Sequence, residues 1–187
     1  MTMRQIIIDH ILLPSLKDLY AKDYSNIMYG VSERNISARL SYHMELRMRA
    51  FDSANNSRMF TDYFVDVEYN RMGNGLLKQY ENSEHRPVYM VSDLLIHSRG
   101  YLPNLLAVEL KREGNKKGVE TDRDRLMSLV SPASDSNMEN RCVHDTMLGA
   151  FIVFSKDRVT IELYESTNGF GINTDIITMI YGNGELV

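Results

Sequence analysis

Two mostly apolar segments near the middle of the chain predict β-strands joined by a turn. The first is 88–97, VYMVSDLLIH, and the second is 105–112, LLAVELKR. The connection 98–104 contains Gly100 and Pro103, which are typical of a turn. Because both segments are apolar over most of their length, we expect them to lie inside a sheet that is covered on both faces.

Three other segments carry apolar residues at helical spacing. Residues 4–20 form one of them, with Pro14 either kinking the helix or starting a second one. Ser32 is a favourable N-cap for a helix over 32–51. The third helix is expected over 119–130. The stripe that predicts the second helix comprises Ile36, Leu40, Met44 and Met48.

Further strands are predicted before and after this central region. Segment 59–71 alternates apolar and polar residues, and 147–155 and 158–166 form a pair of strand-like runs near the C-terminus. Segment 172–187 is compatible with a strand or a short helix, and 22–29 is expected to be a surface loop. The order is therefore helix, three strands, helix, strand, which predicts an α/β fold with a central mixed sheet flanked by helices.

Each central strand carries one acid inside its apolar run, Asp93 in the first and Glu109 in the second. Alternation places Glu109 and Lys111 on one face of their strand, and pairing of the two strands would bring Asp93 to the same face. Buried carboxylates are costly unless their charge is compensated. A divalent cation such as Mg²⁺, which takes carboxylate, water and phosphate oxygens, is the natural partner for them.

The pattern Asp93…Glu109-Leu110-Lys111 resembles the signature of the PD-(D/E)XK, or restriction-endonuclease-like, nuclease superfamily. Ser92-Asp93 stands where many members have Pro-Asp, and Glu109-x-Lys111 matches the second half. The resemblance implies an αβββαβ core over about residues 30–165, within a single domain of 1–187 whose residues 1–29 form a helical extension.

The resemblance also implies an activity, hydrolysis of phosphodiester bonds by a nuclease that depends on Mg²⁺ or Mn²⁺. Asp93 and Glu109 would hold the metal, with Glu33 or Glu68 completing its ligands, and Lys111 would act on the attacking water. Glu33 has an alternative role as a favourable charge near a helix N-terminus. The alternative for Glu68 is a solvent-exposed position at the end of a strand, with no role in metal binding.

Substrate contacts and partners follow from the same resemblance. The expected partner is nucleic acid, DNA more than RNA, and a homodimer is expected because many members cut two strands; the superfamily includes phage and mobile-element proteins. His97 can instead be structural, and the basic residues can be solvated loop charges. The residues predicted to contact substrate are Arg71, His97, Arg99, Arg112, Lys116 and Lys117.

Composition and charge argue against several classes of protein, but they do not decide between the functional and structural roles of these residues. The 187 residues are 43% hydrophobic and 25% charged, as in ordinary globular domains, and no apolar run reaches the roughly 20 residues of a membrane span. Asp9 and His10 interrupt the first apolar stretch, which does not resemble a signal peptide. The lone Cys142 excludes an intrachain disulfide and favours a reducing compartment, the cytoplasm. A net charge of −4 argues against a protein that coats nucleic acid non-specifically.

Two other functional classes remain open. One is a catalytically inactive domain of the same fold that binds nucleic acid or serves in assembly. The other is a structural α/β protein in which the Glu-x-Lys triplet is accidental. G-x-S-x-G, P-loop and C-x-x-C motifs are all absent from the sequence.

Overall fold

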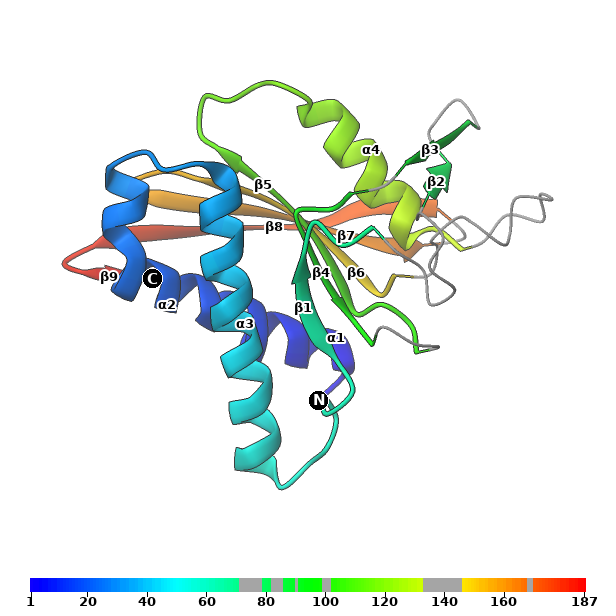
Figure 1. The fold of residues 1–187 in the computed structure, drawn as a ribbon, viewed down its shortest axis with the longest axis horizontal. Coiled ribbons are helices and arrows are strands. Elements are labelled where there is room, and N and C mark those ends of the chain that lie inside the picture. The colour runs from blue at the N-terminus through cyan, green and yellow to red at the C-terminus, as the bar shows by residue number, and fades with distance from the viewer. Residues whose placement is uncertain (71–78, 82–85, 90, 99–101, 133–145, 168–169) are drawn as a thin grey trace.

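The computed structural model describes residues 1–70, 79–81, 86–89, 91–98, 102–132, 146–167 and 170–187. It has a curled mixed sheet with helices on both faces (Figure 1). No helix in these ranges combines the length and apolar character needed to cross a membrane.

Four α-helices, one π-helical segment and nine strands make up this part of the chain. The helical segments are α1 (Met3–Ile6), η1 (Ile7–Leu12), α2 (Leu13–Met28), α3 (Glu33–Asn55) and α4 (Val119–Val130). The strands are β1 (Phe64–Val67), β2 (Gln79–Glu81), β3 (Pro87–Tyr89), β4 (Leu94–His97), β5 (Leu106–Arg112), β6 (Leu148–Phe154), β7 (Arg158–Thr167), β8 (Phe170–Gly182) and β9 (Glu185–Leu186).

The main sheet has seven strands in the order β1-β4-β5-β6-β7-β8-β9, and β2 and β3 form a separate pair. Strand β4 is antiparallel to both β1 and β5, whereas β5 and β6 are parallel. Helix α4 makes the crossover between these parallel strands, as a parallel connection requires. The remaining pairs are antiparallel, with a bulge between Leu163 and Tyr164 where β7 meets β8.

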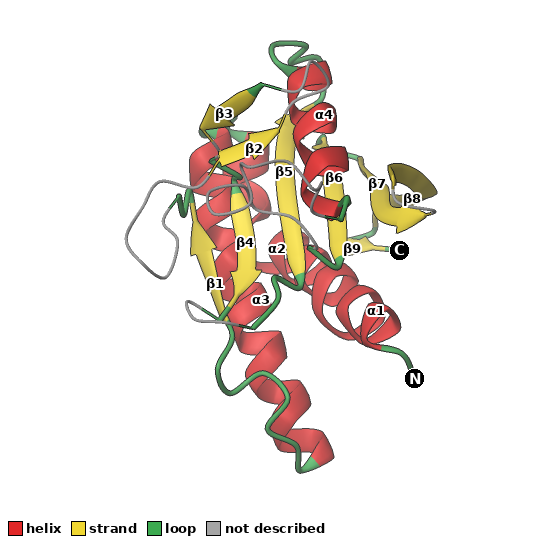
Figure 2. Ribbon diagram, turned by 90° about the vertical axis from the view of Figure 1, so that its right-hand side faces the viewer, coloured by secondary structure: helices red, strands yellow, loops and turns green. Residues whose placement is uncertain are grey.

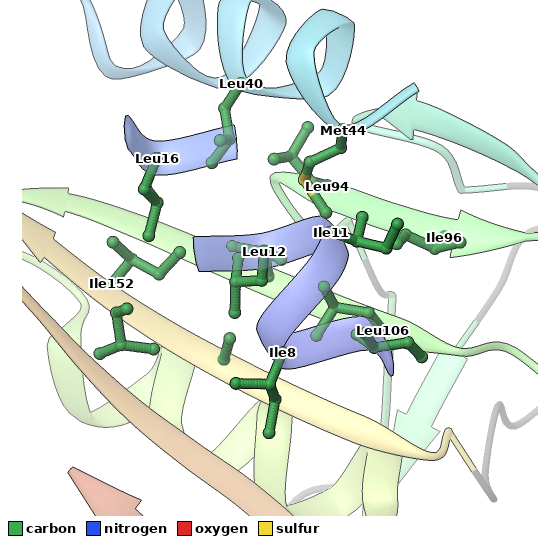
Figure 3. Packing of buried hydrophobic residues seen from close by; sticks show 14 of the residues in the cluster. Ile8, Ile11, Leu12, Leu16, Leu40, Met44, Leu94, Ile96, Leu106 and Ile152 are labelled. Carbon is green, nitrogen blue, oxygen red and sulfur yellow. The ribbon is translucent and has the colours of Figure 1, made fainter. Parts of the chain in front are cut away.

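One face of the sheet is covered by the N-terminal helices, as Figure 3 shows for Ile8, Ile11 and Leu12 of η1 packed over β4, β5 and β6. Pro14 at the start of α2 cannot donate a backbone hydrogen bond, and the wider π-helical turn lies directly before it. Helix α3 adds a fully buried stripe to this layer, and its Ser32 cap accepts a hydrogen bond from the Asn35 N–H at 3.2 Å. The stripe consists of Ile36, Leu40, Met44 and Met48.

The opposite face is covered by α4, which lies across β5 and β6 with the β2–β3 pair beside it (Figure 2). Leu126, Leu129 and Val130 of α4 form a small apolar cluster with Leu95 and Phe151 of the sheet. Ala107 of β5 faces α4. Because side chains alternate along a strand, Glu109 and Lys111 lie on this same face. Helix α4 therefore covers the face that carries the candidate site.

Several predicted elements are confirmed. The helices at 32–51 and 119–130 and the strands at 105–112, 147–155 and 158–166 appear at nearly the predicted bounds. For the C-terminal segment, left open between strand and helix, the structure has strands β8 and β9.

Three predictions about elements were wrong. Segment 22–29 is not a loop, because α2 continues to Met28 and buries Ile27 completely. The strand predicted at 59–71 is confined to Phe64–Val67, because Asp52 accepts hydrogen bonds from the N–H groups of Met59 and Phe60 and holds them in a turn. Segment 88–97 is split between β3 and β4, which belong to different sheets.

Candidate active site

Asp93, directly before β4, and Glu109, within β5, lie near each other where these two strands meet. In the β4–β5 register Leu94 pairs with Val108, and continuing this register by one residue would place Asp93, which immediately precedes β4, opposite Glu109. Directly opposed residues of an antiparallel pair share a face, with Cβ atoms about 5 Å apart, and like charges in such a pair are destabilising. The predicted approach of the two acids thus agrees with the strand pairing.

The Asp93 carboxylate is fixed by the backbone of β5. Its Oδ2 accepts a hydrogen bond from the Leu110 N–H at 2.7 Å. Directly before β4 begins at Leu94, a side-chain oxygen thus takes the place of a backbone carbonyl as acceptor for β5. The bond anchors the Asp93 carboxylate to the chain between Glu109 and Lys111.

Lys111 reaches α4. Its Nζ lies 2.8 Å from Oδ2 of Asp122, a residue in the first two turns of that helix. The side chains are only 15% and 8% exposed, respectively, so this ion pair is shielded from solvent more than a surface pair. Asp122 thereby directs the ammonium group toward the face that carries Asp93 and Glu109.

Glu109 also has a partner on α4. Its Oε1 lies 2.6 Å from an Nη of Arg125, and the Glu109 side chain is 2% exposed. Arg125 additionally lies 3.4 Å from Asp122 and donates to the Val91 carbonyl at 3.2 Å. Asp122 and Arg125 thus link Lys111 to Glu109 through one turn of helix.

The sequence interpretation missed the roles of Asp122 and Arg125. Their spacing could have revealed that they face the sheet. Asp122 and Arg125 lie four residues before Leu126 and Leu129, respectively, so they continue the buried face of α4 toward its N-terminus. Charged residues on the buried stripe of a helix need partners in the sheet beneath it.

Glu33, at the start of α3, approaches from the other side of β5. Its Oε1 accepts hydrogen bonds of 2.8 Å from the Arg112 N–H and from the Asn115 side-chain amide. Its charge contributes to the electrostatic environment of both Asp93 and Lys111. Glu33 therefore lies at the margin of the acid pair, where its carboxylate also ties α3 to the end of β5.

The site concentrates negative charge in a poorly solvated place. Burial raises the pKa of Glu109 to about 8, with Asp93 and Asp122 adding to the rise and Arg125 opposing it. Burial likewise raises the pKa of Asp93, against the hydrogen bond from Leu110 and the charge of Lys111. Burial lowers the pKa of Lys111, but the bond to Asp122 together with the charges of Asp122, Glu33 and Asp93 outweighs this effect and raises the pKa, so Lys111 stays protonated.

These residues fit a hard divalent cation. Burial raises the pKa values of both carboxyl groups, so a cation bound between them would stabilise their ionised form, and oxygen ligands of this kind suit Mg²⁺ or Mn²⁺. Among the residues that the structure describes, no three His, Cys, Asp or Glu side chains are grouped to hold a metal. Mg²⁺ commonly takes only one or two carboxylates and completes its shell with water and phosphate.

Two predicted residues lie outside this group of side chains. Glu68 has a left-handed backbone (φ 51°), and its N–H donates to the Asp93 carbonyl at 3.2 Å, but its carboxylate pairs with Arg34 at 3.1 Å. His97 is 3% exposed and lies 2.9 Å from the Asp66 carboxylate, at the other end of β4 from Asp93. These contacts support the structural alternative for His97.

Arg112, predicted to contact substrate, has its guanidinium engaged away from the acid pair. Strand alternation turns Arg112 to the face opposite Lys111, where its guanidinium donates to the carbonyls of Ile27 and Val31. Lys116 and Lys117 are exposed in the β5–α4 connection, so they remain available to a ligand. Arg71 and Arg99 lie outside the described residues.

Comparison of the chain with models of protein families, with curated proteins and with solved structures found no match.

Proposed function

We propose that the protein is a divalent-metal-dependent nuclease that hydrolyses phosphodiester bonds, of DNA more than of RNA. The observation that carries the proposal is the pair of neighbouring acids, Asp93 and Glu109, at the junction of β4 and β5, with Lys111 on the same face of β5 as Glu109. An accidental Glu-x-Lys triplet gives no reason for the second acid to lie near the first.

The order of the elements supports the same proposal. Helix α3 precedes the antiparallel strands β1, β4 and β5, and α4 then crosses over to β6, which is parallel to β5. This order agrees with the αβββαβ core that the resemblance to PD-(D/E)XK nucleases implies. Asp93 immediately precedes the second of these three strands and Glu109 and Lys111 lie in the third, as that resemblance requires.

In the proposed mechanism Asp93 and Glu109 would hold the metal ion. A bound Mg²⁺ lowers the pKa of a water ligand and offsets charge on the scissile phosphate. Lys111 keeps its proton and stabilises the negative charge that develops on the phosphate oxygens. Asp122 holds the Lys111 ammonium in position, and the hydrogen bond from Leu110 holds Asp93.

The test is a cleavage panel with labelled single- and double-stranded DNA and RNA in Mg²⁺ and in Mn²⁺. We expect cleavage by the wild type that EDTA removes, and a loss of at least about 10²-fold in Lys111→Ala and Asp93→Ala, in line with removal of one electrostatic group from an active site. Lys156→Ala, which removes an exposed lysine between β6 and β7, is the matched control and should cleave normally. Full cleavage by both site variants would exclude the mechanism.

A second candidate function is a catalytically inactive module of the same fold that binds nucleic acid. The ion pair between Arg125 and Glu109 favours it, because it already supplies one buried carboxylate with a counter-charge. Binding of Mn²⁺ separates the two candidates, since an inactive module has no need to bind a metal ion.

A further inference from the structure

Arg125 of α4 forms an ion pair with Glu109. The distance from Nη to Glu109 Oε1 is 2.6 Å, and the Arg125 side chain is 16% exposed. A guanidinium cannot lose its proton at any physiological pH. A permanent positive charge therefore lies beside a residue that the proposed function assigns to the metal.

The charges around Arg125 are balanced only in part. Among the described residues Arg125 pairs with Glu109 and Asp122, and Lys111 pairs with Asp122, whereas the Asp93 carboxylate accepts the Leu110 N–H. This arrangement accounts for a core that folds around three acids without an external cation. It also places the guanidinium where a divalent ion shared by Asp93 and Glu109 would feel its repulsion.

We infer that Arg125 is a built-in counter-ion of Glu109, which stabilises the metal-free site and competes with the divalent cation for that carboxylate. The inference rests on the proposed function, because it takes Asp93 and Glu109 as the metal ligands. A phosphate group arriving with the substrate would offer Arg125 another anion, so cation and substrate should bind with positive coupling.

Arg123, on the same helix, supplies the matched control. It too is paired with acids, since its guanidinium lies 2.6 Å from Glu162 and 2.8 Å from Glu120, but it contacts β7 instead of the candidate site. Arg123→Gln therefore removes the same charge from the same helix without changing the partner of Glu109. Arg125→Lys keeps the charge at position 125.

The experiment titrates the purified, metal-free protein with Mn²⁺ and counts the free ion by electron paramagnetic resonance. We expect Arg125→Gln to bind Mn²⁺ at least about tenfold more tightly than the wild type, because a like charge a few ångströms from the ion is removed. Arg123→Gln and Arg125→Lys should bind as the wild type does. Adding a phosphorothioate oligonucleotide should tighten Mn²⁺ binding in the wild type more than in Arg125→Gln.

Equal or weaker binding of Mn²⁺ by Arg125→Gln would overturn the inference, as would the absence of binding in all four proteins. If Arg125→Gln unfolds without metal, the inference requires Mn²⁺ to restore its circular dichroism spectrum, and no recovery would contradict it. Failure of the proposed function gives a different result. In that case the wild type binds Mn²⁺ but cleaves none of the nucleic acids in the panel.

Discussion

At the scale of single residues, the acid pair is held by contacts that differ in kind. Asp93 is bound by a backbone N–H, whereas Glu109 is bound by a guanidinium. A backbone donor cannot leave without breaking the strand, but a side chain on a helix can turn away. Asp93 is thus the rigid ligand of the proposed pair and Glu109 the adjustable one.

The raised pKa of Glu109, about 8, predicts a pH effect on the metal-free protein. A carboxyl whose pKa is higher in the folded state than in the unfolded state binds more protons when folded, so its ionisation costs stability as pH rises through that interval. We therefore compare the unfolding temperatures of the wild type and Glu109→Gln. The wild-type value minus the variant value should decrease as the pH rises from about 5 to about 8. Saturating Mg²⁺ should reduce this fall.

The control for this measurement is Glu185→Gln, which alters an exposed glutamate in β9. The unfolding temperature of that variant should stay parallel to the wild type across the same pH range. A constant difference between the wild type and Glu109→Gln would show that ionisation of Glu109 carries no cost in the folded protein.

At the scale of elements, α3 links the site to the N-terminal layer. Its cap Ser32 precedes Glu33, whose carboxylate accepts hydrogen bonds from Arg112 and Asn115 at the end of β5. The start of the helix and the end of the strand are therefore fixed to each other by one side chain.

Loss of this cap has an expected cost. Ser32→Ala removes the acceptor for the Asn35 N–H and should lower the free energy of unfolding by about 1 kcal/mol, measured by urea denaturation. Ser53→Ala, near the exposed C-terminal end of the same helix, should change it by less than about 0.5 kcal/mol. Equal effects of the two substitutions would show that the cap contributes nothing specific.

At the scale of the whole molecule, α4 is held between β8 and the candidate site. Gly171 of β8 passes so close to this helix that an added Cβ would lie 2.0 Å from the Met127 carbonyl oxygen. The Gly171 N–H also donates to Ser131 just after the helix, at 2.9 Å. The far end of α4 thus sets the position of the end that carries Asp122 and Arg125.

Gly171→Ala should force α4 and β8 apart and lower the free energy of unfolding by about 1–3 kcal/mol, as overpacking does. Gly182→Ala is the matched control in the same strand, because no atom lies within 4 Å of its added Cβ. Thermal and urea unfolding of both variants provide the measurement. An unaffected Gly171→Ala protein would mean that the contact with α4 adjusts without cost.

Much of the fold was open to prediction from the sequence, since the signals involved are local. Ser32 begins a helix because its own hydroxyl caps it, and Glu109 and Lys111 share a face because side chains alternate along any strand. The helix over 119–130 was predictable for the same reason, since it ends before Pro132 and has apolar residues at helical spacing.

Only the tertiary structure decided which residues meet. The break in segment 88–97 follows from the pairing of β3 with β2 and of β4 with β1 and β5, and the partners of Glu109 and Lys111 follow from how α4 is rotated over β5. Strand register and helix rotation are set by packing between segments that are distant in the sequence, so a local pattern does not contain them. The sequence alone predicted the two acids and the lysine, while packing supplied the Asp122–Arg125 pair that joins them.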